Sequence, residues 1–191
     1  LMAEYYKQRS DAGLIITEGT SPSPNGLGYA RIPGIFSELQ VEGWKKTTKA
    51  VHENGGKIIV QLMHSGRISH PLNMPKESQI LAPSQVKAAG QMWTDLKGLQ
   101  DFSIPKEMTA QDLLHAKTEY VAAAENALFA GFDGVELHGA NGYLLEEFLS
   151  PISNIRTDQY GGSIENRCRF VIDVVTAVAR AIGKEKTGIR L

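Results

Sequence analysis

The sequence is poor in cysteine, has no surplus of basic residues and contains no long hydrophobic run. Its single cysteine, Cys168, cannot form an internal disulfide and lies in a helical pattern typical of a small core residue. A formal net charge of -1 leaves no positive surface to attract nucleic acid or an anionic membrane. No apolar stretch could span a bilayer, and the first residues lack the charged and then apolar layout of a secretory signal. We therefore expect a cytoplasmic protein whose partner is a small-molecule substrate, not nucleic acid and not a membrane.

The common phosphate-binding turns are also missing. Neither G-x-G-x-x-G nor G-x-x-x-x-G-K-[ST] occurs, although an open doubly wound sheet would normally carry such a turn after its first strand. The remaining composition is ordinary, because the 191 residues are 42% hydrophobic and 21% charged, which is typical of one globular domain with a sizeable core.

Apolar patterns predict strands that alternate with helices along the whole chain. The expected strands are short apolar or β-branched runs, as in a parallel sheet, and they cover Leu14–Thr17, Lys57–Leu62, Phe132–Leu137 and Gly188–Leu191. The expected helices begin at capping residues or end at glycine, and they cover Leu1–Asp11, Glu38–Glu53, Thr109–Gly131 and Ser163–Gly183. Two segments rich in proline or glycine, residues 21–37 and 68–108, are expected to be long loops. The alternation indicates parallel βαβ units in an α/β fold.

A glycine or polar residue stands at the end of each predicted strand, namely Gly19, Gln61, His138 and Arg190. Since the carboxyl ends of parallel strands meet on one rim, this pattern favours a (β/α)8 TIM barrel over an open sheet. A complete barrel has eight strands and about 250 residues. We therefore expect residues 1–191 to form about four strands of such a barrel, roughly its first half to two thirds.

The stretch after the third strand carries the strongest chemical signal. His138, Asn141 and Tyr143 leave the end of a buried strand together, and they bring two hydrogen-bond donors and one phenol to the rim. Taken singly, each of them could be a packing residue. Their combination with Gln61 and Arg190 at neighbouring strand ends indicates a binding or catalytic site.

Five segments carry a resemblance that covers essentially the whole chain: residues 17–20, 33–35, 61–67, 138–144 and 154–167. Together they resemble the motifs of the Old Yellow Enzyme family, which are FMN-dependent ene reductases on a (β/α)8 barrel. The resemblance implies that residues 1–191 are a partial flavin-binding barrel, with the first strand and the C-terminal strands missing. It implies FMN as cofactor and NAD(P)H as reductant. It also implies the reduction of activated C=C bonds, in α,β-unsaturated carbonyls, maleimides or nitro compounds, by a ping-pong hydride transfer.

One group of residues is implied to contact the flavin. The backbone at Gly19, the side-chain amide of Gln61, Arg190 and His138 match the positions that border the flavin ring in the family. A cation beside the pyrimidine edge stabilises the anionic reduced flavin, and an amide can both donate and accept hydrogen bonds there.

A second group is implied to act on the substrate. His138 and Asn141 match the pair that binds the substrate oxygen, on which negative charge develops as hydride adds. Tyr143 matches the proton donor, and a phenol with an ordinary pKa near 10 keeps its proton at neutral pH until a basic carbanion forms. Tyr29 and Met63 are expected to line the substrate pocket, and Met63 stands where many relatives have tryptophan.

Other charged and polar residues are given no chemical role. We expect no metal site, because His64 and His70 belong to a motif whose role in the family is not metal binding. Glu146 and Glu147 are expected to lie on a solvated or interface face. Arg156, Asp158, Arg167 and Arg169 are expected to form a structural network between a loop and a helix.

Two other functions stay open. The chain could be a catalytically inactive, truncated half barrel whose copies form a homo-oligomer through exposed sheet edges, because the phosphate-holding loops of such barrels would follow Leu191. It could also be the barrel part of a dienoyl-CoA reductase-like flavoenzyme, although no cysteine cluster for an iron-sulfur centre is present.

Overall fold

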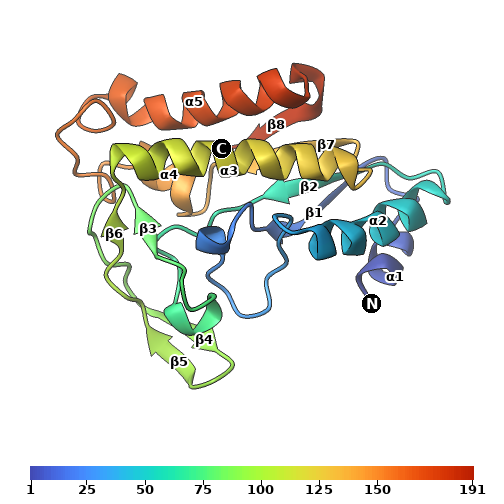
Figure 1. Ribbon diagram of the computed structural model, residues 1–191, viewed down its shortest axis with the longest axis horizontal. Helices are drawn as coiled ribbons and strands as arrows, with labels where there is room; N and C mark the ends of the chain where they lie inside the picture. The colour runs from blue at the N-terminus through green and yellow to red at the C-terminus, as the bar shows by residue number, and fades with distance from the viewer.

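The computed structural model describes residues 1–191 and is organised around a four-stranded parallel sheet (Figure 1). The strands stand side by side in chain order: β1 (Ile15–Thr20), β2 (Ile58–Leu62), β7 (Gly134–His138) and β8 (Thr187–Arg190). The four predicted strands are confirmed, with small shifts at their ends. Neighbouring strands come from consecutive βα units, as in the wall of a barrel.

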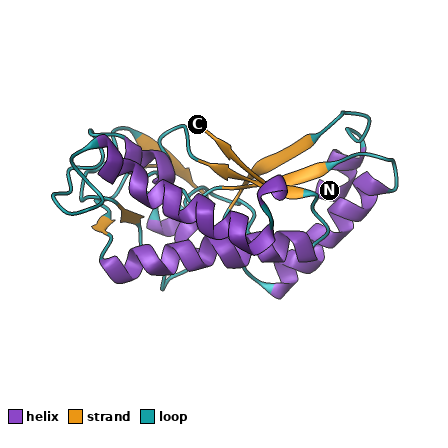
Figure 2. Cartoon of the chain, turned by 90° about the horizontal axis from the view of Figure 1, so that it is seen from above, coloured by secondary structure: helices purple, strands orange, loops and turns teal.

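The helices of the βα units lie on one face of the sheet. They are α1 (Met2–Lys7), α2 (Glu38–His52), α3 (Ala110–Phe129), the short α4 (Leu144–Leu149) and α5 (Ile164–Ile182). Figure 2 shows them gathered on one side of the strands, while the other face of the sheet has no covering layer. This is one part of a (β/α)8 wall, so the predicted partial barrel is confirmed. None of the helices combines the length and the apolarity that a bilayer-spanning segment requires.

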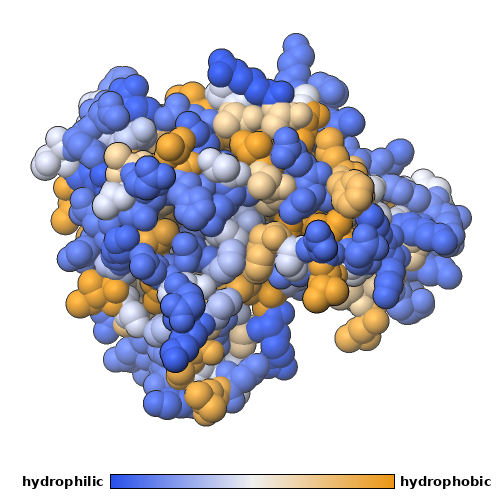
Figure 3. Space-filling view, in the orientation of Figure 1, coloured by the Kyte–Doolittle hydropathy of each residue, from blue (hydrophilic) through white to orange (hydrophobic).

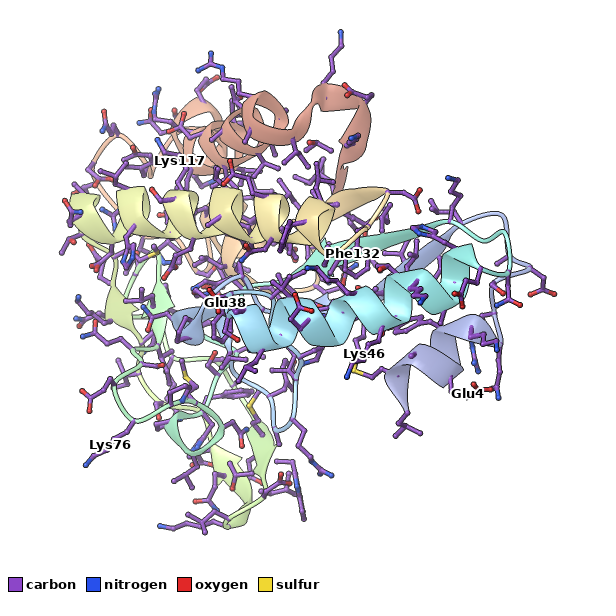
Figure 4. All side chains as sticks on the ribbon, turned by 45° about the vertical axis from the view of Figure 1, so that its right-hand side comes forward. Glu4, Glu38, Lys46, Lys76, Lys117 and Phe132 are labelled. Atoms are coloured by element: carbon purple, nitrogen blue, oxygen red, sulfur yellow. The ribbon has the colours of Figure 1, made fainter.

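Alternate residues of the central strands form the core between the sheet and the helices. Val60, Leu62, Val135 and Leu137 are at most 1% exposed, and the residues between them in sequence face the uncovered side of the sheet. The helices contribute buried aromatic residues to the same core, among them Trp44, Tyr120, Phe148 and Phe170. Figure 4 shows Phe132, which leads into β7, between α2 and α3.

Residues 68–108 were expected to be a loop, and this prediction is wrong in part. The segment contains two short strand pairs, β3 (Leu81–Ala82) with β6 (Lys106–Glu107) and β4 (Gln91–Thr94) with β5 (Gly98–Asp101). These strands form the part of the molecule that extends away from the main sheet in Figure 1. A small separate core of Ala88, Met92 and Phe102 holds the β4–β5 hairpin in place. Strands of two to four residues are too short to give a readable alternation.

The two outer strands of the sheet, β1 and β8, leave apolar side chains at the surface. Leu14, Ile16 and Leu191 are 51%, 44% and 79% exposed. Two surface hollows lie beside α1: one of about 510 Å³ between α1 and α2, and one of about 750 Å³ between α1 and β1. Neither hollow contains the polar residues of the site described below. Figure 3 shows orange hydrophobic residues reaching the surface among the blue polar ones.

At the amino end of the sheet, Asp133 joins β2 to β7. Its carboxylate accepts hydrogen bonds from the Ile58 N–H at 2.9 Å and from Lys57 Nζ at 3.0 Å, and His52 Nε2 lies 2.9 Å away. Burial alone would raise the pKa of Asp133, but these three partners outweigh burial and hold the pKa below its usual value.

We predict that Asp133→Asn lowers the free energy of unfolding by about 1 to 2 kcal/mol at neutral pH, because charge-assisted hydrogen bonds are lost. Since the folded pKa is depressed, this stabilisation is present above the unfolded aspartate pKa of about 3.9 and disappears as the pH falls through the lower folded value. Urea unfolding of both proteins at neutral and at acid pH measures the difference. An equal difference at both pH values would contradict the account.

Candidate active site

The parallel register brings the polar strand ends to one edge of the sheet. Gly19 lies beside Gln61 across the β1–β2 pair, and Gln61 lies beside Glu136 across the β2–β7 pair. His138 lies beside Arg190 across the β7–β8 pair. Because side chains alternate along a strand, the side chains of Gln61, Glu136, His138 and Arg190 share the face that no helix covers.

Gln61 is held in place from two sides. Its backbone N–H donates to Thr17 Oγ1 at 3.1 Å, and its side-chain Nε2 donates to Glu136 Oε1 at 2.7 Å. The side chain is 8% exposed, so these contacts fix the direction of the remaining amide oxygen. The sequence analysis missed Glu136, which lies inside an apolar run. Its position two residues before His138 was the available signal, because residues i and i+2 of a strand share a face.

Met63 lies directly over Gly19. Its backbone N–H donates to the Thr20 carbonyl oxygen at 2.9 Å, which continues the β1–β2 pairing beyond the strand. A Cβ atom added at Gly19 would lie 2.6 Å from Met63 Sδ, so no side chain fits at this position while Met63 keeps its place. The glycine thereby makes room for the Met63 side chain on the rim.

His138 is a neutral hydrogen-bond donor. Burial lowers its pKa, the nearby Arg190 charge lowers it further, and Glu136 and Glu146 oppose this shift only in part. Its Nδ1 accepts from the Ala140 N–H at 3.4 Å, so the proton of the neutral ring resides on Nε2. The side chain is 5% exposed and therefore presents a fixed donor.

Asn141 lies at a sharp turn after β7. Its φ of 61° is in the left-handed region, which asparagine tolerates better than most residues, and Gly142 follows with φ 84°. The Gly142 N–H donates to a Glu146 carboxylate oxygen, which fixes the turn. The Asn141 side chain is exposed and forms no hydrogen bond within the chain, so its amide is available to a ligand.

Three aromatic rings meet beside this turn. Tyr143 is the residue that precedes α4, and its ring lies 5.0 Å from the ring of His138 and 6.2 Å from that of Tyr29, edge to face in both pairs. The hydroxyl groups of Tyr29 and Tyr143 are 3.0 Å apart. Burial, and then the hydrogen bond to Tyr143, raises the pKa of Tyr29, so the Tyr29 phenol keeps its proton at this contact. Tyr29 itself packs against Met92 and Phe102 of the hairpin core.

The structure therefore brings the predicted residues to one region of the molecule. Gly19, Gln61, Met63, His138 and Arg190 lie on the rim of the sheet, and the loop after β7 places Asn141 and Tyr143 next to them, with Tyr29 against Tyr143. Their individual roles stay predictions. The expectation for Glu147 is wrong, because this side chain is 1% exposed and lies inside the protein.

Fold and side chains together define part of a barrel enzyme with a polar site at the carboxyl ends of its strands. The model of the family described as "NADH:flavin oxidoreductase / NADH oxidase family" matches residues 1–191, so the chain belongs to that family. The resemblance to Old Yellow Enzyme is confirmed on this basis.

Named relatives agree with this assignment. The chain is 46% identical over 195 residues to a "Probable flavin mononucleotide-dependent alkene reductase" of Leishmania infantum, covering 100% of the chain and 53% of the relative. It is 47% identical over 192 residues to "Flavin oxidoreductase hxnT" of Emericella nidulans, covering 100% of the chain and 49% of the relative. The chain thus spans about half the length of these relatives.

Solved structures give the same result. An Old Yellow Enzyme homologue from Zymomonas mobilis has a TM-score of 0.96 and 45% identity, with 100% of this chain and 53% of the other covered. A morphinone reductase in complex with tetrahydroNAD has a TM-score of 0.95 and 46% identity, with 100% and 54% covered.

The rim residues fit the pyrimidine edge of a flavin. The Gln61 amide oxygen has no partner within the chain, and Arg190 is exposed and forms no ion pair. An oriented amide and an unpaired cation beside a glycine backbone match an edge that carries both donors and acceptors.

We predict that Arg190→Gln raises the pKa of His138, because removal of the guanidinium removes one of the two influences that disfavour the imidazolium form. Titration of the histidine ring signals by NMR measures the change, and Arg180→Gln, on the exposed end of α5, serves as the control. An unchanged His138 pKa in Arg190→Gln would show that Arg190 does not act on the imidazole.

Proposed function

We propose that the protein containing this chain is an FMN-dependent oxidoreductase that takes hydride from NADH or NADPH and reduces activated C=C bonds. The substrates are α,β-unsaturated carbonyls, maleimides or nitro compounds, and the two half-reactions alternate at one site. The observation that carries the proposal is the convergence of His138, Asn141 and Tyr143 beside the flavin-suited residues Gln61 and Arg190. The names of the alkene reductase and of the morphinone reductase complex with tetrahydroNAD support it.

The chain contributes a cofactor-binding edge to this reaction. When bound, FMN supplies the hydride-transfer chemistry. Gly19, Gln61 and Arg190 would hold its pyrimidine edge, and Glu136 fixes the Gln61 amide in one orientation. The Arg190 charge favours the reduced, anionic form of the cofactor.

His138 and Asn141 act on the substrate oxygen. The Nε2–H of the neutral His138 ring is a fixed donor, and the free Asn141 amide is a second donor from the adjacent turn. As hydride adds to the β-carbon, negative charge moves to the carbonyl or nitro oxygen. Donors that are already oriented stabilise this charge more than they stabilise the ground state.

Tyr143 supplies the proton to the α-carbon. Its hydroxyl lies 3.0 Å from the Tyr29 hydroxyl, so the phenol has a partner that can share the charge left when the proton departs. Tyr29, which contacts Tyr143, and Met63, which lies over Gly19, are assigned to the substrate pocket, where the flexible thioether of Met63 would adapt to substrates of irregular shape.

Steady-state rates with cyclohexenone and either NADH or NADPH test this function on the full-length protein. We expect a yellow protein with enone-dependent oxidation of at least one of the two nucleotides. A colourless protein with no turnover would overturn the proposal.

We predict that Tyr143→Phe slows alkene reduction by about 10²- to 10⁴-fold, because a general acid is lost, while reduction of the flavin stays near normal. Stopped-flow measurement of each half-reaction separates the two effects, and Tyr5→Phe on the exposed face of α1 is the matched control. Equal losses in both half-reactions would contradict the assigned role.

The 191-residue chain taken alone supports a second proposal, which is that it self-associates through its open sheet edges without catalytic activity. Ile16 in β1 and Leu191 directly after β8 are exposed and favour such contacts. The molar mass of this piece in solution, together with its flavin absorbance, provides the test. A colourless oligomer is the expected result, and a yellow monomer would contradict it.

A further inference from the structure

Buried polar atoms without a partner gather in one place beneath the site. Five of the six such atoms in the chain belong to the turn after β2 or to the helices packed on it: His64 Nε2, Ser65 Oγ, Arg67 Nε, Tyr120 OH and Glu147 Oε2. The sixth, Ser78 Oγ, belongs to the 68–108 segment. A concentration of this kind requires an explanation, because buried polar groups are normally hydrogen-bonded.

Glu147 is the centre of this group. It comes from α4, it is 1% exposed, and its Oε1 accepts the backbone N–H of Arg67 at 2.8 Å. The carboxyl group lies against Gly66, where any Cβ atom would overlap it, and Gly66 has a φ of 59° that favours glycine. The turn at Gly66 and the carboxyl group of Glu147 are therefore in close contact.

The surroundings of Glu147 favour the protonated carboxyl. Burial raises its pKa well above the ordinary value, and the Arg67 N–H and the Arg67 charge offset this only in part. Tyr120, whose phenol interacts electrostatically with Glu147, adds no positive charge, because burial raises its pKa and keeps it protonated. His64, in the turn after β2, adds none either, because burial lowers its pKa to about 4. A protonated carboxyl has one accepting and one donating oxygen, and the Arg67 N–H uses the accepting one.

The same residue is connected to Tyr143 through the backbone. The Glu147 N–H donates to the Tyr143 carbonyl oxygen at 2.8 Å, and the Leu144 N–H donates to the His64 carbonyl oxygen at 3.1 Å. The first turn of α4 is thus attached to the turn after β2 by one backbone bond and by the Glu147 side chain. Since Tyr143 precedes this helical turn, the attachment determines where its phenol lies.

We propose that Glu147 is a positioning residue for Tyr143, because its buried side chain fixes the start of α4 on the 64–67 turn. In this account the carboxyl group of Glu147 is neutral in the folded protein, since burial raises its pKa. The effect of Glu147 on catalysis rests on the function proposed above. The protonated state of Glu147 and its effect on the position of Tyr143 do not depend on that function. Glu147→Gln keeps a hydrogen-bond acceptor and a hydrogen-bond donor in the side chain but removes the titratable group. Glu147→Leu keeps most of the side-chain volume but removes both the acceptor and the donor.

Half-reaction kinetics on the full-length holoenzyme test the catalytic part. In Glu147→Leu we expect alkene reduction to slow by about 10- to 100-fold, as small displacements of a reacting group do, with flavin reduction changed by less than about threefold. Glu147→Gln should restore alkene reduction to within about threefold of the wild type. Loss of both half-reactions together in Glu147→Leu, or failure of Glu147→Gln to restore the rate, would overturn the positioning role.

Two further measurements test the role of Glu147 without measuring turnover. Infrared difference spectra of wild type against Glu147→Gln should show the C=O band of a protonated carboxylic acid at neutral pH, and a carboxylate band there would overturn the proposal. Crystal structures should show the Tyr29–Tyr143 hydroxyl contact retained in Glu147→Gln and broken in Glu147→Leu. If Tyr143 keeps its position in Glu147→Leu, the positioning role is wrong, whether or not the enzyme reduces alkenes. If the wild-type protein reduces no alkene, only the proposed function is wrong.

The pH dependence of the free energy of unfolding also tests whether Glu147 is protonated in the folded protein. Because the folded pKa of Glu147 is raised, the folded state holds a proton that the unfolded state has released above about pH 4.3, so this group makes the free energy of unfolding fall as the pH rises from there towards the folded pKa. Glu147→Gln should remove that fall. If the two proteins show parallel pH profiles, Glu147 is not held in the neutral form.

Discussion

The parallel hydrogen-bonded register of β2, β7 and β8 determines where every polar group of the site lies. It places Gln61 beside Glu136 and His138 beside Arg190, and it turns all four side chains to the face without helices. A shift of one residue in either strand pair would turn these side chains into the apolar core, where their charges could not be solvated. The core residues Val60, Leu62, Val135 and Leu137 oppose such a shift, because they would then leave the core. The packing that stabilises the sheet thus also specifies the site.

The loop after β7 adds what a strand alone cannot provide. Its left-handed turn at Asn141 and Gly142 reverses the chain within a few residues, so a donor and a phenol reach the rim already occupied by His138. The Arg190 charge and burial keep the imidazole neutral, and the Ala140 N–H determines which of its nitrogens carries the proton. Local backbone geometry and electrostatics therefore prepare one donor in one orientation, which is the condition for stabilising a developing oxyanion.

Sequence reasoning was successful where a pattern repeats and where a motif is contiguous. Periodicity located the four strands and the long helices, and the cluster from His138 to Tyr143 is visible because its members are neighbours in sequence. Sequence reasoning was unsuccessful where the burial or pairing of a residue depends on a contact between segments that are far apart in sequence. Glu147 stands next to Glu146 in a run that reads as a solvated helix face, and only the close approach of the 64–67 turn, some eighty residues earlier, shows that it is buried. The hairpin of residues 68–108 escaped prediction for a related reason, since its short strands are held by a small separate core and by Tyr29.

The central claim is that residues widely separated in sequence surround one opening in which a flavin and an alkene lie together. A crystal structure of the full-length protein with FMN and a bound enone tests it most directly. The account predicts the flavin pyrimidine edge within hydrogen-bonding distance of Gln61 and Arg190, and the enone oxygen within hydrogen-bonding distance of both His138 and Asn141. A flavin bound elsewhere, or an enone oxygen that contacts neither of these two side chains, would contradict it.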